Sequence, residues 1–249
     1  FLYAIKRNLN INIQIIFPSN KFTHKLVVSD GVFSMDGDIA DIATLVEASQ
    51  QHNAWLMIDD AHGVGVLGDN GSGCVASTWS STEVPILVGT LGKALGTAGA
   101  FVAGDAELIE HLIQFSRSYI YTTAQPPAIA AATLKALEIV QSEPELRAQL
   151  NANIAYFRRE ALLLGLPLSD SVTPIQPLIL GDEVRTLRWA AQLQQRGIHV
   201  GAIRPPTVPS GEARLRITLN AGHTRDHIDQ LLAALTTCQR EEAMCLTHA

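Results

Sequence analysis

The sequence predicts an α/β fold, with a mostly parallel sheet covered by helices on both faces, followed by a smaller α+β domain. Two observations predict it. Short, continuously apolar runs alternate with helical patterns through the first half of the chain, which is typical of strands buried on both faces. The pattern then changes near Ser142-Glu143-Pro144. We therefore expect a first domain over residues 1–143 and a second over 144–249, each able to bury a core because 47% of the residues are hydrophobic.

The elements of the first domain follow from local patterns. Apolar runs predict strands at 25–29, 54–58, 85–88 and 100–103, and residues 119–122 are expected to be extended. Helical patterns fall between or after them, over 38–51, 105–116 and 126–141. Asp38 is the expected N-cap of the first helix, and Pro126-Pro127 suits the start of the last one.

The second domain is expected to begin with a long helix over 145–164. Strands are then predicted over 175–180, 198–203 and 214–219, and helices over 183–196 and 224–235. Antiparallel pairing suits the last strands. Arg214 and Arg216 alternate with apolar residues, so they share one face of their strand, and we expect that face to be solvated.

Bulk composition limits the classes of function. The net charge is −6 at pH 7 without a block of basic residues, so no nucleic-acid partner is expected. No apolar run reaches membrane-spanning length and no signal peptide is recognised, so no membrane partner is expected. The three cysteines, Cys74, Cys238 and Cys245, have neither a disulfide-framework nor a metal-ligand spacing. These features favour a cytoplasmic protein.

Two polar motifs follow predicted strands directly. Residues 58–63 read IDDAHG and bring two carboxylates and a histidine, whereas residues 89–96 read GTLGKALG and bring a single lysine between glycines. A lysine that loses its charge beside a buried strand is a nucleophile that can form a Schiff base with an aldehyde. A carboxylate on a neighbouring strand suits a pyridinium nitrogen. Together the motifs indicate a pyridoxal phosphate enzyme.

Other interpretations of these motifs are possible. Lys93 could be a surface lysine in a glycine-rich turn, and a phosphate-binding P-loop is excluded because alanine follows the lysine. Asp59, Asp60 and His62 could form a solvated strand end or a helix cap. They could also bind a metal, but the sequence offers no further ligand cluster, so we expect none. Asp59 and Asp60 should have different roles, because neighbours in a strand point to opposite faces.

Five segments, in order, closely resemble the α-oxoamine synthases, which are fold-type I pyridoxal phosphate enzymes. They are VVSDGVFSMDGD at 27–38, DDAHG at 59–63, GTLGK at 89–93, YTTAQPP at 121–127 and RPPTVP at 204–209. The resemblance covers about residues 25–235. It implies a decarboxylative condensation of an amino acid with an acyl thioester, and a homodimer with shared active sites.

The resemblance also implies roles for residues that match the family motifs. Lys93 matches the Schiff-base lysine, which also removes the substrate Cα proton, and Asp59 the carboxylate that keeps the pyridine nitrogen protonated. His62 matches the histidine that bonds the phenolic oxygen of the cofactor. Ser34 matches a serine near that oxygen, and Thr90 a phosphate contact.

Two more roles concern the partner subunit and the substrate. Thr122, with Thr123 beside it, matches a phosphate contact that the neighbouring subunit donates. Arg204 matches the arginine that holds the substrate carboxylate through its guanidinium fork. The double proline after Arg204 is most similar to the family member of biotin synthesis that joins L-alanine to a pimeloyl thioester, carried by coenzyme A or a carrier protein.

Alternatives remain open at the level of activity. The 2-amino-3-oxobutyrate ligases and 5-aminolevulinate synthases tend to lack that double proline, and a generic aminotransferase does not explain the segment 204–209. The family segments that precede these motifs are not visible upstream of Ser34, and Phe1 to Thr23 matches the family poorly. We therefore expect an N-terminally truncated homologue that carries the lysine half of the site and is inactive alone.

Overall fold

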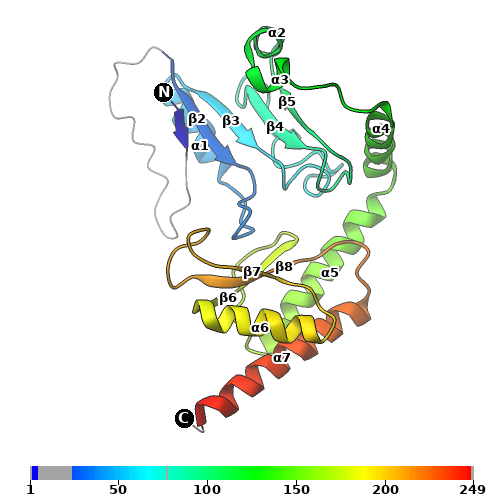
Figure 1. Cartoon of the computed structure of the whole chain (residues 1–249). Helices are drawn as coiled ribbons and strands as arrows, with labels where there is room; N and C mark the ends of the chain where they lie inside the picture. The colour runs from blue at the N-terminus through cyan, green and yellow to red at the C-terminus, as the bar shows by residue number, and fades with distance from the viewer. Residues whose placement is uncertain (1, 5–23, 77, 248–249) are drawn as a thin grey trace. The chain divides into compact units, whose positions relative to one another are not determined.

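The computed structural model describes residues 2–76 and 78–247 apart from 5–23, and they form two compact units (Figure 1). Unit 1 comprises Phe1–Phe33 and Ile39–Pro144, and unit 2 comprises Ser34–Asp38 and Glu145–Ala249. The predicted domains, 1–143 and 144–249, differ from these units because the short segment Ser34–Asp38 belongs to unit 2. The expected poor match over Phe1 to Thr23 lies largely outside the described residues.

Unit 1 is built on a five-stranded sheet with the order β1-β2-β3-β4-β5. Its strands are β1 (Leu2–Ala4), β2 (Leu26–Asp30), β3 (Trp55–Asp59), β4 (Ile86–Thr90) and β5 (Ala100–Ala103). The first four are parallel, and β5 is antiparallel to β4. In this register Asp30 lies opposite Asp59, and Asp59 opposite Val88, so the carboxyl ends of the central strands reach one edge together.

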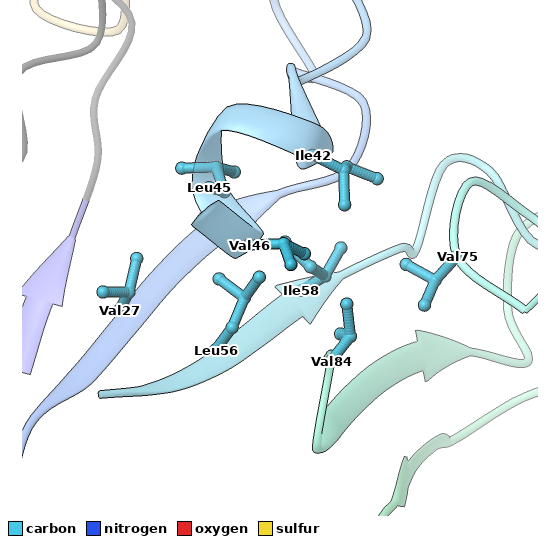
Figure 2. Packing of buried hydrophobic residues seen from close by; sticks show 8 residues of the cluster. All are labelled: Val27, Ile42, Leu45, Val46, Leu56, Ile58, Val75 and Val84. Atoms are coloured by element: carbon cyan, nitrogen blue, oxygen red, sulfur yellow. The ribbon is translucent and has the colours of Figure 1, made fainter. Parts of the chain in front are cut away.

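The core of unit 1 lies between the sheet and α1 (Ile42–Gln51), as Figure 2 shows. The helix buries Ile42, Leu45 and Val46 at helical spacing. The strands β2 and β3 supply Val27, Leu56 and Ile58 from the facing side, and Val75 and Val84 complete the cluster. The packing fixes the strands whose ends carry the polar motifs.

The start of α1 differs from the sequence prediction. The helix begins at Ile42 and not at Asp38, and its N-cap is Asp41, whose Oδ1 accepts the Thr44 N–H at 3.1 Å. Asp38 does not act as the cap because the segment Ser34–Asp38 belongs to unit 2. Val32 and Ile39 form an antiparallel bridge, which closes a loop over the residues between them.

Three helices follow β5: α2 (Ala106–Phe115), α3 (Arg117–Ile120) and α4 (Pro127–Ser142). The prediction that 119–122 is extended was wrong. The N–H groups of Ile120 and Tyr121 donate to the carbonyls of Ser116 and Arg117, so a helical turn satisfies this backbone locally. α2 and α3 bury no residue, and α4 buries only Thr133.

Unit 2 packs three long helices with a three-stranded antiparallel sheet of order β6-β8-β7, which confirms the predicted antiparallel pairing. Its elements are α5 (Pro144–Leu163), β6 (Ile175–Gly181), α6 (Glu183–Gln195), β7 (Gly201–Ile203), β8 (Ala213–Thr218) and α7 (Arg225–Thr247). Phe157, Leu178, Trp189 and Leu215 are fully buried in its core. The last helix continues well beyond the predicted end at 235, and β7 is shorter than predicted.

The segment Ser34–Asp38, which we name the strap, is bound into unit 2 by polar side chains. The hydroxyls of Ser171 and Thr173 both donate to the Gly37 carbonyl at 2.8 Å. Arg214 donates to Asp36 at 2.6 Å and to Glu212 at 2.9 Å, and is only 1% exposed. The expectation of a solvated face for Arg214 was therefore wrong, because the strap covers it.

Among the helices that the structure describes, none combines the length and the apolar character needed to span a membrane.

Candidate active site

Three charged residues of unit 1 lie at or just after the carboxyl ends of neighbouring strands of the sheet. Asp30 ends β2, Asp59 ends β3, and Lys93 follows β4. Burial raises the pKa of the Asp30 carboxyl, and the Asp59 charge raises it further, whereas the Lys93 charge lowers it. The register places Asp30 opposite Asp59, and the charges of Asp59 and Lys93 both act on Asp30, so the three side chains are candidates for one site.

Lys93 is presented on a short turn. The turn is closed by the Thr97 N–H, which donates to the Leu91 carbonyl at 2.9 Å, and by the Gly96 N–H, which donates to the Lys93 carbonyl at 3.0 Å. Gly96 has a φ of +64°, which favours glycine, and a Cβ there would have no atom within 4 Å. The Lys93 side chain is exposed on this turn. Its amine is therefore accessible to a ligand.

Asp59 and Asp60 point to different surroundings, as their alternation in the chain predicts. Asp59 is partly buried, and its Oδ1 accepts the Ala61 N–H at 3.0 Å. Asp60 is buried beneath the following loop. His62 is partly buried in that loop, three residues after Asp59, the last residue of β3.

Thr90 is the last residue of β4, and its hydroxyl is already engaged. The hydroxyl donates to the Gly99 carbonyl at 3.1 Å and accepts the Gly92 N–H at 3.2 Å. A hydroxyl has one hydrogen, so contact with a phosphate oxygen as donor requires Thr90 to release Gly99. The residue is placed at the end of the strand beside Lys93.

Thr122 lies just after α3 and is exposed. Its neighbour Tyr121 is 77% exposed, with the Arg117 guanidinium 5.7 Å from the centre of its ring. Thr123 is exposed as well. The two threonines therefore lie on an open face of unit 1.

Ser34 and Arg204, the remaining predicted site residues, belong to unit 2. The Ser34 carbonyl accepts the Arg216 Nε–H at 2.7 Å, so Ser34 is fixed to the sheet of unit 2 through the strap. Arg204 follows β7 and is exposed. Within the part of the chain that the structure describes, its guanidinium has no ion-pair or hydrogen-bond partner, which leaves its fork open to a carboxylate.

Two functional candidates, Asp30 and Arg216, were missed by the sequence reasoning, and a third, Asp60, was named there without the contacts that the structure gives it. Asp30 shares the edge with Asp59, and its position after the apolar run of β2 was a usable signal. Arg216 holds the strap, and burial lowers the pKa of its guanidinium. Asp60 lies beneath the His62 loop. For Arg216 and Asp60 the pattern carried no signal, because their partners are distant in the sequence.

The described residues contain no group of three or more histidine, cysteine, aspartate or glutamate side chains able to hold a metal ion.

Comparison with known proteins defines the class. The model of the family described as aminotransferase class I and II matches residues 12–235, and the chain belongs to this family. An 8-amino-7-oxononanoate synthase of Chromohalobacter salexigens is 66% identical over 218 residues, which are 88% of this chain and 56% of that protein. The chain spans about half the length of the curated relatives it matches.

Two solved structures show the same fold. A structure of SPT with its pyridoxal phosphate internal aldimine has a TM-score of 0.83 and 30% identity, and the match covers 88% of this chain and 55% of that one. The 8-amino-7-oxononanoate synthase of Francisella tularensis has a TM-score of 0.78 and 34% identity, with 88% and 64% covered. The predicted fold-type I class and the resemblance to α-oxoamine synthases are both confirmed.

Proposed function

We propose that this chain is the lysine-bearing part of a pyridoxal phosphate-dependent acyltransferase of the 8-amino-7-oxononanoate synthase type. The proposed reaction joins L-alanine to a pimeloyl thioester with loss of carbon dioxide, as a step of biotin synthesis. The observation that carries the proposal is that Asp30 and Asp59 end the adjacent strands β2 and β3, and Lys93 follows the next strand, β4. The 66% identity to a relative with that name supports the choice within the family.

The residues at this edge fit pyridoxal phosphate. The amine of Lys93 is exposed for the aldehyde, and Oδ1 of Asp59 already accepts the Ala61 N–H, which leaves Oδ2 for a ring N–H. When bound, the cofactor would supply a protonated ring that takes up the electron pair released at the substrate Cα. The pairing with Asp59 keeps that ring nitrogen protonated.

The other residues of unit 1 complete the binding in this proposal. Lys93 would take the proton from Cα of L-alanine. His62 would donate a hydrogen bond to the phenolic oxygen of the cofactor, and Thr90 would hold its phosphate in place of the Gly99 carbonyl. Each of these acts on a stated atom, so single substitutions should have separable effects.

Unit 2 supplies the substrate contacts in this proposal. Arg204 holds the carboxylate of L-alanine, because a guanidinium with no protein partner can form a bidentate pair with it. Ser34 contributes a cofactor contact, and the bond from Arg216 to its carbonyl fixes its position. Replacing Arg204 with lysine should raise the KM for L-alanine far more than it changes cofactor binding.

We also propose that the protein is a homodimer, in which Thr122 reaches the neighbouring subunit's site. The support is that large apolar side chains are exposed on α2, α3 and α4 and directly after α3. They include Phe115, Tyr119, Tyr121 and Leu134. Apolar patches of this kind on a soluble protein commonly mark an interface.

Sedimentation velocity tests the dimer with two matched variants. Leu134→Asp places a charge on α4, where Leu134 is 69% exposed, and should shift the chain toward monomer. Val184→Asp is the control, since Val184 is 71% exposed on α6 and should leave the dimer unchanged. A wild-type monomer, or an equal effect of both variants, would contradict the proposed interface.

A chimera tests the reaction itself. The segment of the Chromohalobacter salexigens synthase that matches this chain is replaced by the corresponding residues from this chain. We expect L-alanine and a pimeloyl thioester to give the amino ketone and carbon dioxide. A keto acid alone would instead show an aminotransferase, and a preference for glycine would show a ligase of the 2-amino-3-oxobutyrate type. Either of these products would overturn the proposal.

The proposal includes a cytoplasmic setting. It is supported by Cys74 and Cys238, which are both free thiols, as expected in a reducing compartment.

A further inference from the structure

The loop after β3 is organised around Asp60, a side chain to which the proposed reaction gives no task. Asp60 is 0% exposed. Its Oδ2 accepts the backbone N–H of Cys74 at 2.7 Å, and its carbonyl accepts the N–H groups of Gly63 and Val64 at 3.0 Å. One residue thus binds both ends of the loop 61–74, which carries His62.

Three glycines leave room for the Asp60 carboxylate because they have no Cβ atom. A Cβ at Gly63 would lie 2.0 Å from Oδ1, and a Cβ at Gly73 would lie 1.9 Å from Oδ2. A Cβ at Gly31, after β2, would lie 2.9 Å from Oδ1. Because real Cβ atoms do not approach oxygen so closely, each glycine is needed for the backbone to enclose the carboxylate.

Burial of this carboxylate is costly. Burial is the largest cause that raises the pKa of the Asp60 carboxyl, and hydrogen bonding by Cys74 opposes the shift. Burial together with the Asp60 charge raises the pKa of the Cys74 thiol as well. Within the described residues, Oδ1 of Asp60 has no hydrogen-bond partner. A polar group kept at such a cost calls for a specific explanation.

We propose that Asp60 is a positioning residue that fixes His62 after the end of β3 by locking the loop 61–74. The inference rests on the proposed function for the role of His62 at the cofactor. The locking by the side chain rests on the bond from the Cys74 N–H to Oδ2 and on the glycines that enclose the carboxylate, because the bonds to Gly63 and Val64 come from the main-chain carbonyl. The two aspartates at the end of β3 then have different roles, since Asp59 pairs with the proposed cofactor and Asp60 fixes the loop.

Amide hydrogen exchange of the 249-residue chain tests the locking. Asp60→Asn keeps the shape of the side chain but replaces a charged acceptor with an amide. Loss of a charge-assisted hydrogen bond should speed exchange within residues 63–74 by about tenfold or more. Exchange in β2, β3 and α1 should stay unchanged. Asp105→Asn is the matched control, because Asp105 is exposed in the same unit and makes no side-chain cap bond.

The ring NMR signal of His62, assigned with His62→Gln, tests the positioning. Asp60→Asn should move this signal, and Asp105→Asn should not. Gly73→Ala is a second route to the same loosening, because its Cβ would displace Oδ2 of Asp60. It should give the same loop-limited exchange and displace the His62 signal.

Three outcomes would overturn the inference. They are an unchanged loop in Asp60→Asn, a uniform rise of exchange across unit 1, or a loosened loop with an unmoved His62 signal. These measurements need no cofactor, so they are separate from the proposed function. Failure of the chimera to form the amino ketone would refute the function and leave the exchange and NMR results to decide on Asp60.

Discussion

The helices of unit 2 bury their apolar faces, whereas most helices of unit 1 do not. In unit 2, α5 buries Phe157 and α6 buries Trp189 in a shared core. In unit 1, α1 behaves in the same way, but α2 and α3 bury no residue. Unit 2 is therefore a self-contained structure, and the α2–α4 region of unit 1 is a surface suited to a partner. The proposed shared-site residue Thr122 lies in that region.

The largest expected difference between the two regions comes from identical truncations of leucine. Leu178 is 0% exposed in β6, so Leu178→Ala should lower the free energy of unfolding by about 3–5 kcal/mol through lost burial and a cavity. Leu134→Ala on α4 should cost less than about 0.5 kcal/mol in dilute, monomeric protein. Urea unfolding followed by circular dichroism measures both. Equal losses of the free energy of unfolding in the two variants would contradict the difference between the two regions.

The next largest effect concerns the ion pairs of the strap. Arg214→Met should destabilise unit 2 by about 3 kcal/mol, the low end for breaking a buried pair, because Asp36 and Glu212 stay partly hydrated. With Trp55 and Trp79 of unit 1 replaced by phenylalanine, the fluorescence of Trp189, the one tryptophan in unit 2, reports the unfolding of this unit in urea. Arg159→Met removes an exposed arginine of α5 and should change little. An equal effect of the two variants would contradict a role for the strap.

The smallest effect compares two helix caps within unit 1. Asp41→Ala should cost about 1 kcal/mol, because the Asp41 carboxylate accepts from the backbone and hydroxyl of Thr44. Asp105→Ala should cost less, since Asp105 makes no side-chain cap bond to α2. Thermal unfolding of the two variants gives the difference. A larger loss for Asp105→Ala would show that α2 is better fixed than its exposure indicates.

The pH dependence of the Asp41 cap has a definite sign. Hydrogen bonds from the Thr44 side chain and backbone lower the pKa of the Asp41 carboxyl in the folded chain. The cap therefore contributes its full stability above the unfolded pKa of about 3.9, and this stability is lost as the pH falls through the folded value below it. The difference between wild type and Asp41→Ala should shrink in acid. A difference that is constant down to pH 2 would contradict this cause.

Local pattern was enough to predict much of the fold and the position of the polar residues at the carboxyl edge of the sheet. Apolar runs located β2, β3, β4 and β5, because strands buried in a parallel sheet need apolar side chains along their length. Lys93 and Asp59 were found for the same reason, since polar residues that directly follow such runs mark the carboxyl edge of the sheet.

The errors occurred where distant segments decide the structure. Arg214 and Asp36 are 178 residues apart, so no pattern in β8 could show that the strap covers this arginine. Because the strap belongs to unit 2, α1 begins at Ile42 and not at the predicted Asp38. Residues 119–122 were predicted to be extended because tyrosine and isoleucine favour strands, but 119 and 120 belong to the helical turn Arg117–Ile120. Its backbone is satisfied within the turn.

The absorbance spectrum of the purified chain with pyridoxal phosphate, beside Lys93→Ala, tests the central claim most directly. We predict a visible absorbance band of cofactor bound to the wild-type protein, which disappears in the variant while the circular dichroism of both stays the same. A band of unchanged intensity that persists in Lys93→Ala would contradict the assignment of Lys93 as the residue that holds the cofactor.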